Sequence, residues 1–168
     1  LSQPIHRYEF VLGKYLGLAM LIGTVTLAMG VGAGVYIAVL GGSVNLSYVE
    51  AVLLIYCKLL LVTGLSVLLS TVTSPILGAI VVLTAYFFGH ATGIMVDLPG
   101  HFDGTSMKAM IETLYYVVPN LSNFDVWREY ANGVHVPHTY VVWTIGYGLA
   151  FTAILLYLAA MAFQEKDV

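Results

Sequence analysis

Charged residues are scarce in this sequence. They make up 9% of its 168 residues, whereas a soluble globular domain carries roughly 25%. Six Lys and Arg residues oppose nine Asp and Glu residues, so the chain lacks the basic patch that would indicate a nucleic-acid partner. Its single cysteine, Cys57, excludes an internal disulfide. The Gly-x-x-x-x-Gly-Lys-Ser/Thr motif is also absent, which indicates that this chain does not itself hydrolyse ATP.

Long apolar runs take the place of charge. Hydrophobic residues account for 60% of the chain, and a helix that crosses a bilayer needs about 20 mostly apolar residues. The runs of sufficient length are Tyr15–Leu40, Ala51–Ser70, Pro75–Val96 and Thr139–Phe163. The second and third are separated by "STVTSP", a turn-forming stretch that ends on a proline suited to the first turn of a helix. The sequence therefore predicts an all-α, polytopic transmembrane helix bundle with four spans in one domain, residues 1–168.

The stretch 97–137 has a different composition and holds nearly half of the charged residues. Within it, apolar residues recur at three- and four-residue steps: Met107, Met110, Ile111, Leu114 and Val118. This spacing predicts an amphipathic helix in the last outer loop, at or near the membrane interface. Four spans place both ends of the chain on one side. The slight excess of Lys and Arg in the end segments favours cytoplasmic termini in the plasma membrane.

Two ionisable side chains are predicted within the spans. A charge such as that of Lys58 costs about 2.5–3.5 kcal/mol at the centre of a membrane helix and marks a candidate functional site. Lys58 could face a substrate cavity, pair with an acid on spans outside this sequence, or be held by backbone carbonyls. A lone histidine within a span, such as His90, more often forms a hydrogen bond to a neighbouring helix than it acts as a ligand. His135 and His138 are separated by Pro137, which argues against a helical metal pair, and we predict no metal site or catalytic group.

The opening segment carries a resemblance to a known family. "LSQPIHRYEFVLGKYLGL" resembles the cytoplasmic segment of ABC-2-type transporter permeases, in which Leu-Ser-x-Pro-Ile-x-Arg-x-Glu/Phe runs into Leu-Gly-Lys at the start of a span. The matching residues are Pro4, Ile5, Arg7, Glu9, Gly13 and Lys14. "FFGHATG", "LYYVVPNLSNFDVW" and "AFQEKDV" are similar to elements of one branch, the permeases grouped with maturation of multicopper enzymes such as nitrous-oxide reductase.

The resemblance implies a transport subunit rather than an enzyme. Family members have six spans, so this chain would be the C-terminal four-span portion, with two further spans upstream of Leu1. Residues 1–14 would be a cytoplasmic coupling segment that docks on a separate ABC ATPase. ATP and Mg would bind to that partner, and this chain would carry no cofactor.

The implied partners are the ATPase, a second permease copy or a related permease, and the lipid bilayer. Lys58 and His90 are the substrate-path candidates of the implied ABC exporter. The alternatives are a secondary transporter driven by an ion gradient and a membrane scaffold that transports nothing. From the residues alone, the favoured role of Arg7 and Lys14 is an interfacial anchor whose charged ends reach the headgroups.

Overall fold

The structure, a computed structural model, describes residues 7–95, 119–134 and 136–164. In chain order its elements are α1 (Arg7–Val39), α2 (Leu46–Val72), α3 (Pro75–Met95), the short 3₁₀ helix η2 (Ser122–Phe124), α5 (Trp127–Ala131) and α6 (His138–Gln164). Over these ranges the chain is all-α, as predicted. The predicted amphipathic helix between Met107 and Val118, and the coupling residues Pro4 and Ile5, lie outside the described residues.

Among the described residues, three helices are long and apolar enough to cross a membrane. They are α1, α2 and α6, which correspond to the first, second and fourth predicted spans. Helix α3 has 21 residues, and the apolar stretch found within its described part, Pro75–His90, is shorter than the others. The third predicted span, Pro75–Val96, therefore stays a proposal.

Helix α1 extends beyond the first predicted span. It runs without a break for 33 residues from Arg7, whereas the predicted span began at Tyr15. The span was bounded by charged residues, but charge marks where a helix leaves an apolar environment and does not interrupt its backbone hydrogen bonds. A helix of this length extends about 50 Å, against a hydrocarbon core of about 30 Å. The first turns of α1 can therefore project beyond the membrane as part of the same rod.

The predicted break between the second and third runs is confirmed. The last turn of α2 closes on Thr73, whose backbone N–H and Oγ1–H both donate to Leu69 O, at 2.8 and 2.9 Å. Pro75 is the first residue of α3, where its missing N–H costs no helical hydrogen bond. At its other end, α2 begins after Asn45, whose side chain accepts from the N–H of Tyr48.

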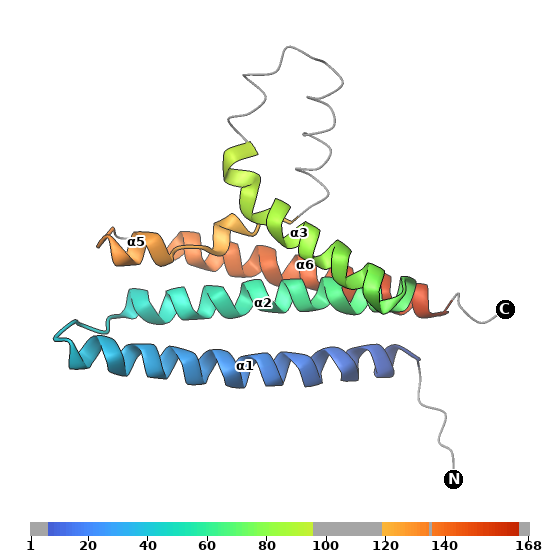
Figure 1. Cartoon of the computed structure of the whole chain (residues 1–168), viewed down its shortest axis with the longest axis horizontal. Coiled ribbons are helices and arrows are strands. Elements are labelled where there is room, and N and C mark those ends of the chain that lie inside the picture. The colour runs from blue at the N-terminus through green and yellow to red at the C-terminus, as the bar shows by residue number, and fades with distance from the viewer. Residues whose placement is uncertain (1–6, 96–118, 135, 165–168) are drawn as a thin grey trace, which may run out of the picture.

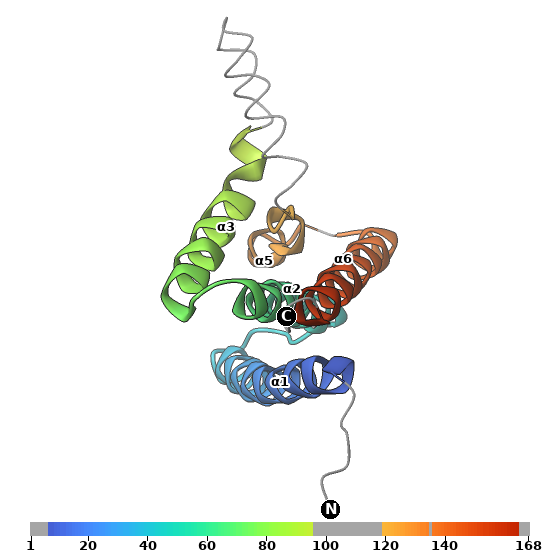
Figure 2. The same cartoon turned by 90° about the vertical axis from the view of Figure 1, so that its right-hand side faces the viewer.

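Helix α2 is the centre of the bundle. It contacts α1, α3, α6 and the short elements η2 and α5. Seen end-on, α1 lies on one side of α2, while α3 and α6 lie on the other with α5 between them (Figure 2). Figure 1 shows α1, α2 and α6 running alongside one another and α3 leaning away from them. The start of α1 and the end of α6 lie at the same end of the bundle (Figure 1).

Two apolar clusters hold the helices together. One joins α2 to α6 and to the segment around η2; its buried members are Ala51, Leu54, Cys57, Leu61, Leu121, Phe124, Val126 and Val141. The other joins the first turns of α1 to the ends of α2 and α6, through Val11, Tyr15, Ala19, Val67 and Ala159. The first turns of α1 are thus packed onto the bundle.

The outward faces of the helices are also apolar. On α1, large exposed side chains include Met20, Leu27, Met29 and Val35, as expected for a helix that contacts lipid or other helices. Threonine hydroxyls inside the helices donate to a backbone carbonyl four residues earlier, as in Thr24 to Met20 O and Thr152 to Gly148 O. These bonds satisfy the hydroxyls without water.

Candidate functional site

A lysine, a histidine and a carboxylate from three separate elements meet between α2 and α3. Lys58, near the middle of α2, has only 7% of its surface exposed. Its Nζ lies 3.5 Å from His90 Nε2 on α3 and 3.7 Å from Asp125 Oδ1, directly after η2. His90 Nε2 lies 3.1 Å from Asp125 Oδ2. We call these three residues the charge cluster.

His90 links the two charged members of the cluster. The 3.1 Å contact to a carboxylate oxygen suits an imidazole whose Nε2–H donates to Asp125. His90 Nδ1 is buried and has no hydrogen-bond partner among the described residues. A doubly protonated ring would leave a buried N–H without an acceptor and would add a second positive charge 3.5 Å from Lys58 Nζ. The geometry therefore favours a neutral imidazole with its proton on Nε2, assigned from the contacts.

Lys58 keeps hydrogen-bonding capacity. An ammonium has three N–H donors, and a charge-assisted bond to oxygen normally measures about 2.7–2.9 Å. Within the described part of the chain, the contacts of Lys58 Nζ are those at 3.5 and 3.7 Å. His90 Nε2 cannot accept from Lys58 while it donates to Asp125. The buried ammonium is thus close to a counter-ion but not fully bonded to it.

Asp125 is the cluster member that sequence reasoning missed. The sequence left three options open for Lys58: a substrate cavity, an acidic partner on spans outside this sequence, or backbone carbonyls. In the structure the acidic group near Lys58 is a carboxylate of this chain, 67 residues further on. The available signal was the setting of Asp125 between the apolar residues Phe124 and Val126, which is unusual for a solvated loop. Both of those neighbours are buried, with 0% and 7% exposure.

The segment that carries Asp125 is packed into the bundle. Its backbone is tied to α3 by the N–H of Leu121, which donates to Gly89 O at 3.1 Å. The side chains of Leu121 and Phe124 are 1% and 0% exposed. Gly89 precedes His90 directly, so one turn of α3 receives this segment and also supplies the histidine. Residues 119–126 of the predicted outer loop are therefore a structural part of the site.

Glycines on α3 and α6 allow this close approach. A Cβ at Gly89 would lie 2.8 Å from Leu121 Cγ and 2.9 Å from the backbone oxygen of Pro119. A Cβ at Gly148 would meet the ring edge of Phe124 at 2.9 Å. The site thus depends on glycine at these two positions, where a larger residue would meet the docked segment.

Replacing Gly89 with alanine is expected to destabilise the docked segment. The added methyl meets backbone as well as side chain, and overpacking of this kind costs about 1–3 kcal/mol. Gly148→Ala should cost less, since only the end of a side chain must move. Gly146→Ala is the matched control, because nothing lies within 4 Å of its Cβ. The melting temperatures of the purified variants give the order of their stabilities. Equal melting temperatures for Gly89→Ala and Gly146→Ala would contradict this account of the segment.

The charge cluster borders a groove between α1 and α2. The groove has a volume of about 690 Å³. Its α1 wall is largely apolar and includes Leu21, Ile22, Val25, Met29 and Ala33; its α2 wall includes Val52, Ile55, Lys58 and Leu59; Tyr86, Asp125 and Trp127 complete the lining. A volume of this size is typical of small-molecule sites, which are mostly apolar with a few polar groups.

Three aromatic residues cluster beside the groove near the start of α2. The rings of Tyr48, Trp127 and Tyr130 lie within 5.5–6.1 Å of one another, centroid to centroid. The hydroxyl of Tyr48 donates to the backbone oxygen of Gly30 on α1. Helices α1 and α2 approach closely here because Gly30 has no side chain. A Cβ at this position would lie 2.9 Å from Val52 Cγ1. Tyr48 thus links α2 to α1 beside the groove.

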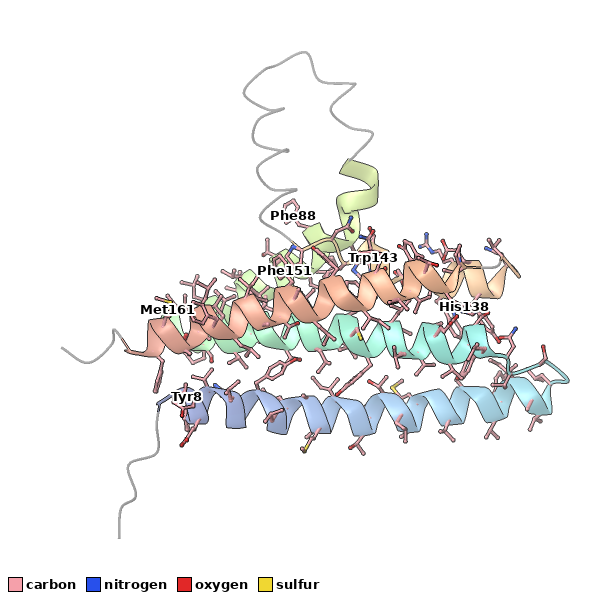
Figure 3. The ribbon with its side chains drawn as sticks, turned by 180° about the vertical axis from the view of Figure 1, so that it is seen from behind. Tyr8, Phe88, His138, Trp143, Phe151 and Met161 are labelled. Carbon is pink, nitrogen blue, oxygen red and sulfur yellow. The ribbon has the colours of Figure 1, made fainter. Side chains whose placement is uncertain are left out.

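The predicted coupling residues begin α1. Arg7 is its first residue and Glu9 lies in its first turn. Lys14 is exposed, and its Nζ donates to Ser70 Oγ near the end of α2 at 3.0 Å. These residues lie at the opposite end of the bundle from His138, as the positions of Tyr8 and His138 in Figure 3 show.

A second ionisable pair lies near that opposite end. His138 Nδ1, at the start of α6, lies 2.5 Å from Glu50 Oε1 in the first turns of α2. Across the described ranges no group of three or more His, Cys, Asp or Glu side chains could hold a metal ion. His135, considered with His138 as a metal pair, lies outside those ranges.

Span-length apolar helices around a buried charge cluster define a multi-pass membrane protein with a polar site between its helices. The comparison of the sequence with protein families makes this specific: the model for ABC-2 family transporter proteins matches residues 1–168, and the chain belongs to that family. No curated protein and no solved structure gives a significant match. The chain is thus the membrane component of an ABC transporter, a non-catalytic subunit of a kind that works with ABC ATPase subunits.

Proposed function

We propose that this chain is the membrane-spanning permease portion of an ATP-driven ABC exporter in the plasma membrane. Separate ATPase subunits bind ATP and Mg, and a second permease copy or a related permease completes the transport path. The observation that carries the proposal is the family match over the whole chain. Both termini are proposed to face the cytoplasm, which is compatible with the start of α1 and the end of α6 lying at one end of the bundle.

Residues 1–14 form the proposed coupling segment. Pro4, Ile5, Arg7, Glu9 and Lys14 match the family motif in order. The motifs "FFGHATG" and "LYYVVPNLSNFDVW" favour the branch grouped with multicopper-enzyme maturation. The substrate of this chain stays open within that branch.

A single helix connects the coupling segment to the groove. Helix α1 begins at Arg7 and supplies one wall of the groove from Leu21 to Ala33. Near its start it is packed on α2 and α6 through Val11 and Tyr15. A push from the ATPase on the first turns would thus move the groove wall against α2, because a helix transmits displacement along its axis.

The charge cluster is the proposed polar element of the substrate path. Lys58 and His90 were candidates from their positions in the spans, and Asp125 joins them by contact. Breaking the contacts of Asp125 would remove one of the attachments of residues 119–126, which are otherwise held by the Leu121–Gly89 hydrogen bond and the buried side chain of Phe124. The cluster can therefore couple occupancy of the groove to the position of residues 119–126.

Co-purification tests the proposed function. The tagged full-length protein, extracted from its native membranes in mild detergent, is expected to carry an ABC ATPase in a near-stoichiometric amount. The complex should hydrolyse ATP. Mass spectrometry identifies the partner, and vanadate inhibition shows that the activity belongs to it. Well-folded protein without any ATPase would contradict the proposal and favour an ion-gradient-driven transporter or a scaffold.

A further inference from the structure

The groove combines an apolar lining with one buried cation. Most of its walls are aliphatic residues of α1 and α2, and Lys58 is buried beside them; among the described residues its ammonium has no hydrogen-bond acceptor or counter-ion closer than 3.5 Å. A purely apolar occupant, such as the side of another helix, would leave the N–H donors of this ammonium unmet. An occupant with an anionic group would supply the acceptors that the distances of 3.5 and 3.7 Å show to be missing.

We propose that the groove binds single-chain amphiphilic anions. The apolar chain lies between the α1 and α2 walls, and the anionic group bonds to Lys58 in place of Asp125. A groove of about 690 Å³ suits one chain. This inference rests on the proposed function, since it names the substrate class of that same site.

Asp125 is suited to leave Lys58 when the anion arrives. Its side chain is 38% exposed, against 9% for the side chain of Lys58. Its contact with Lys58 is an ion pair at 3.7 Å rather than a short hydrogen bond. Water can solvate the carboxylate, whereas the buried ammonium requires a partner, so exchange of one anion for another keeps the cation paired.

Trp127 provides a built-in reporter, because it lines the groove. The other tryptophan of this chain, Trp143, lies on α6 with 75% exposure and can be replaced by phenylalanine. The experiment uses the full-length protein in phosphatidylcholine nanodiscs, with Trp143 and every tryptophan outside this sequence replaced so that Trp127 is the single tryptophan. The probes are 11-bromoundecyl sulfate, 11-bromoundecanol and 11-bromoundecyltrimethylammonium, whose bromine quenches nearby tryptophan.

The wild-type cluster is expected to bind the sulfate about tenfold more tightly than the alcohol, because hydrogen bonds to charged groups contribute at least that factor. The ammonium probe should bind no better than the alcohol. Asp125→Asn should tighten sulfate binding severalfold, since it removes the competing anion. The double variant Lys58→Met with Asp125→Asn, which leaves no unpaired charge, should abolish the preference for sulfate. Arg128→Gln is the control, because it removes an exposed cation that is not among the groove-lining residues.

Two results would overturn the inference. One is a double variant that keeps the wild-type preference for sulfate. The other is a folded wild-type protein in which none of the probes quenches Trp127, which would indicate that a helix covers the groove. Neither result depends on ATP or on an ATPase. Failure of this binding site is therefore distinguishable from failure of the proposed exporter function, which the co-purification tests.

Discussion

Asp125→Asn is expected to destabilise the purified protein more than Lys58→Met. Asp125→Asn leaves a buried ammonium without its counter-ion; for a fully buried pair this loss costs about 3–5 kcal/mol, and the expected cost here is smaller because Asp125 is 38% exposed. Lys58→Met leaves a carboxylate that is 38% exposed and that water can solvate. The two variants remove the same ion pair, so the difference between them measures the unequal burial of its members. Thermal unfolding in one detergent gives the comparison.

The double variant completes this test. Lys58→Met combined with Asp125→Asn should recover most of the stability lost in Asp125→Asn, because no unpaired charge remains. Glu129→Gln, at an exposed carboxylate on α5, serves as the control and should unfold like wild type. A Lys58→Met protein that melts lower than Asp125→Asn would contradict the pairing. For any identified substrate, we expect the stable double variant to transport at least about tenfold more slowly per folded molecule, because a polar element of the path is gone.

Charge reversal in the coupling segment is expected to remove the ATPase. With Arg7→Glu and Lys14→Glu combined, the amount of ATPase that co-purifies should fall to about a tenth of wild type or less, because close like charges replace complementary ones. Mass spectrometry of the tagged protein measures this loss. ATP hydrolysis by the purified sample should fall in parallel.

Ser70→Ala separates coupling from local structure. Lys14 donates to Ser70 Oγ, so its replacement also loosens a contact between α1 and α2. Ser70→Ala removes the same hydrogen bond and leaves the positive charge in place. If Ser70→Ala loses the ATPase as fully as the charge reversal, Lys14 acts by holding α1 and not by meeting the partner. Retention of the ATPase in Ser70→Ala agrees with direct docking.

The helices were predictable because their causes are local. An apolar run of span length satisfies its backbone hydrogen bonds within itself, so its composition and length suffice to identify it. The break after α2 follows from neighbouring residues, Thr73 and Pro75. The first span was bounded at Tyr15 because charge was taken to mark the membrane boundary, whereas α1 begins at Arg7 because the continuity of a helix depends on its backbone hydrogen bonds. A Cβ at Gly30 or Gly34 would meet side chains of α2, whereas nothing described lies within 4 Å of a Cβ at Gly13 or Gly17.

By itself the sequence determined that this is a helical membrane protein with Lys58 and His90 as polar positions in its apolar runs, because the scarcity of charge in long apolar runs admits few other folds. Only the tertiary structure decided what those two residues meet. Asp125 reaches them because Gly89 and Gly148 admit Leu121 and Phe124 between the helices. No local pattern encodes a pairing across 67 residues, since it depends on where α3 and α6 pack against α2.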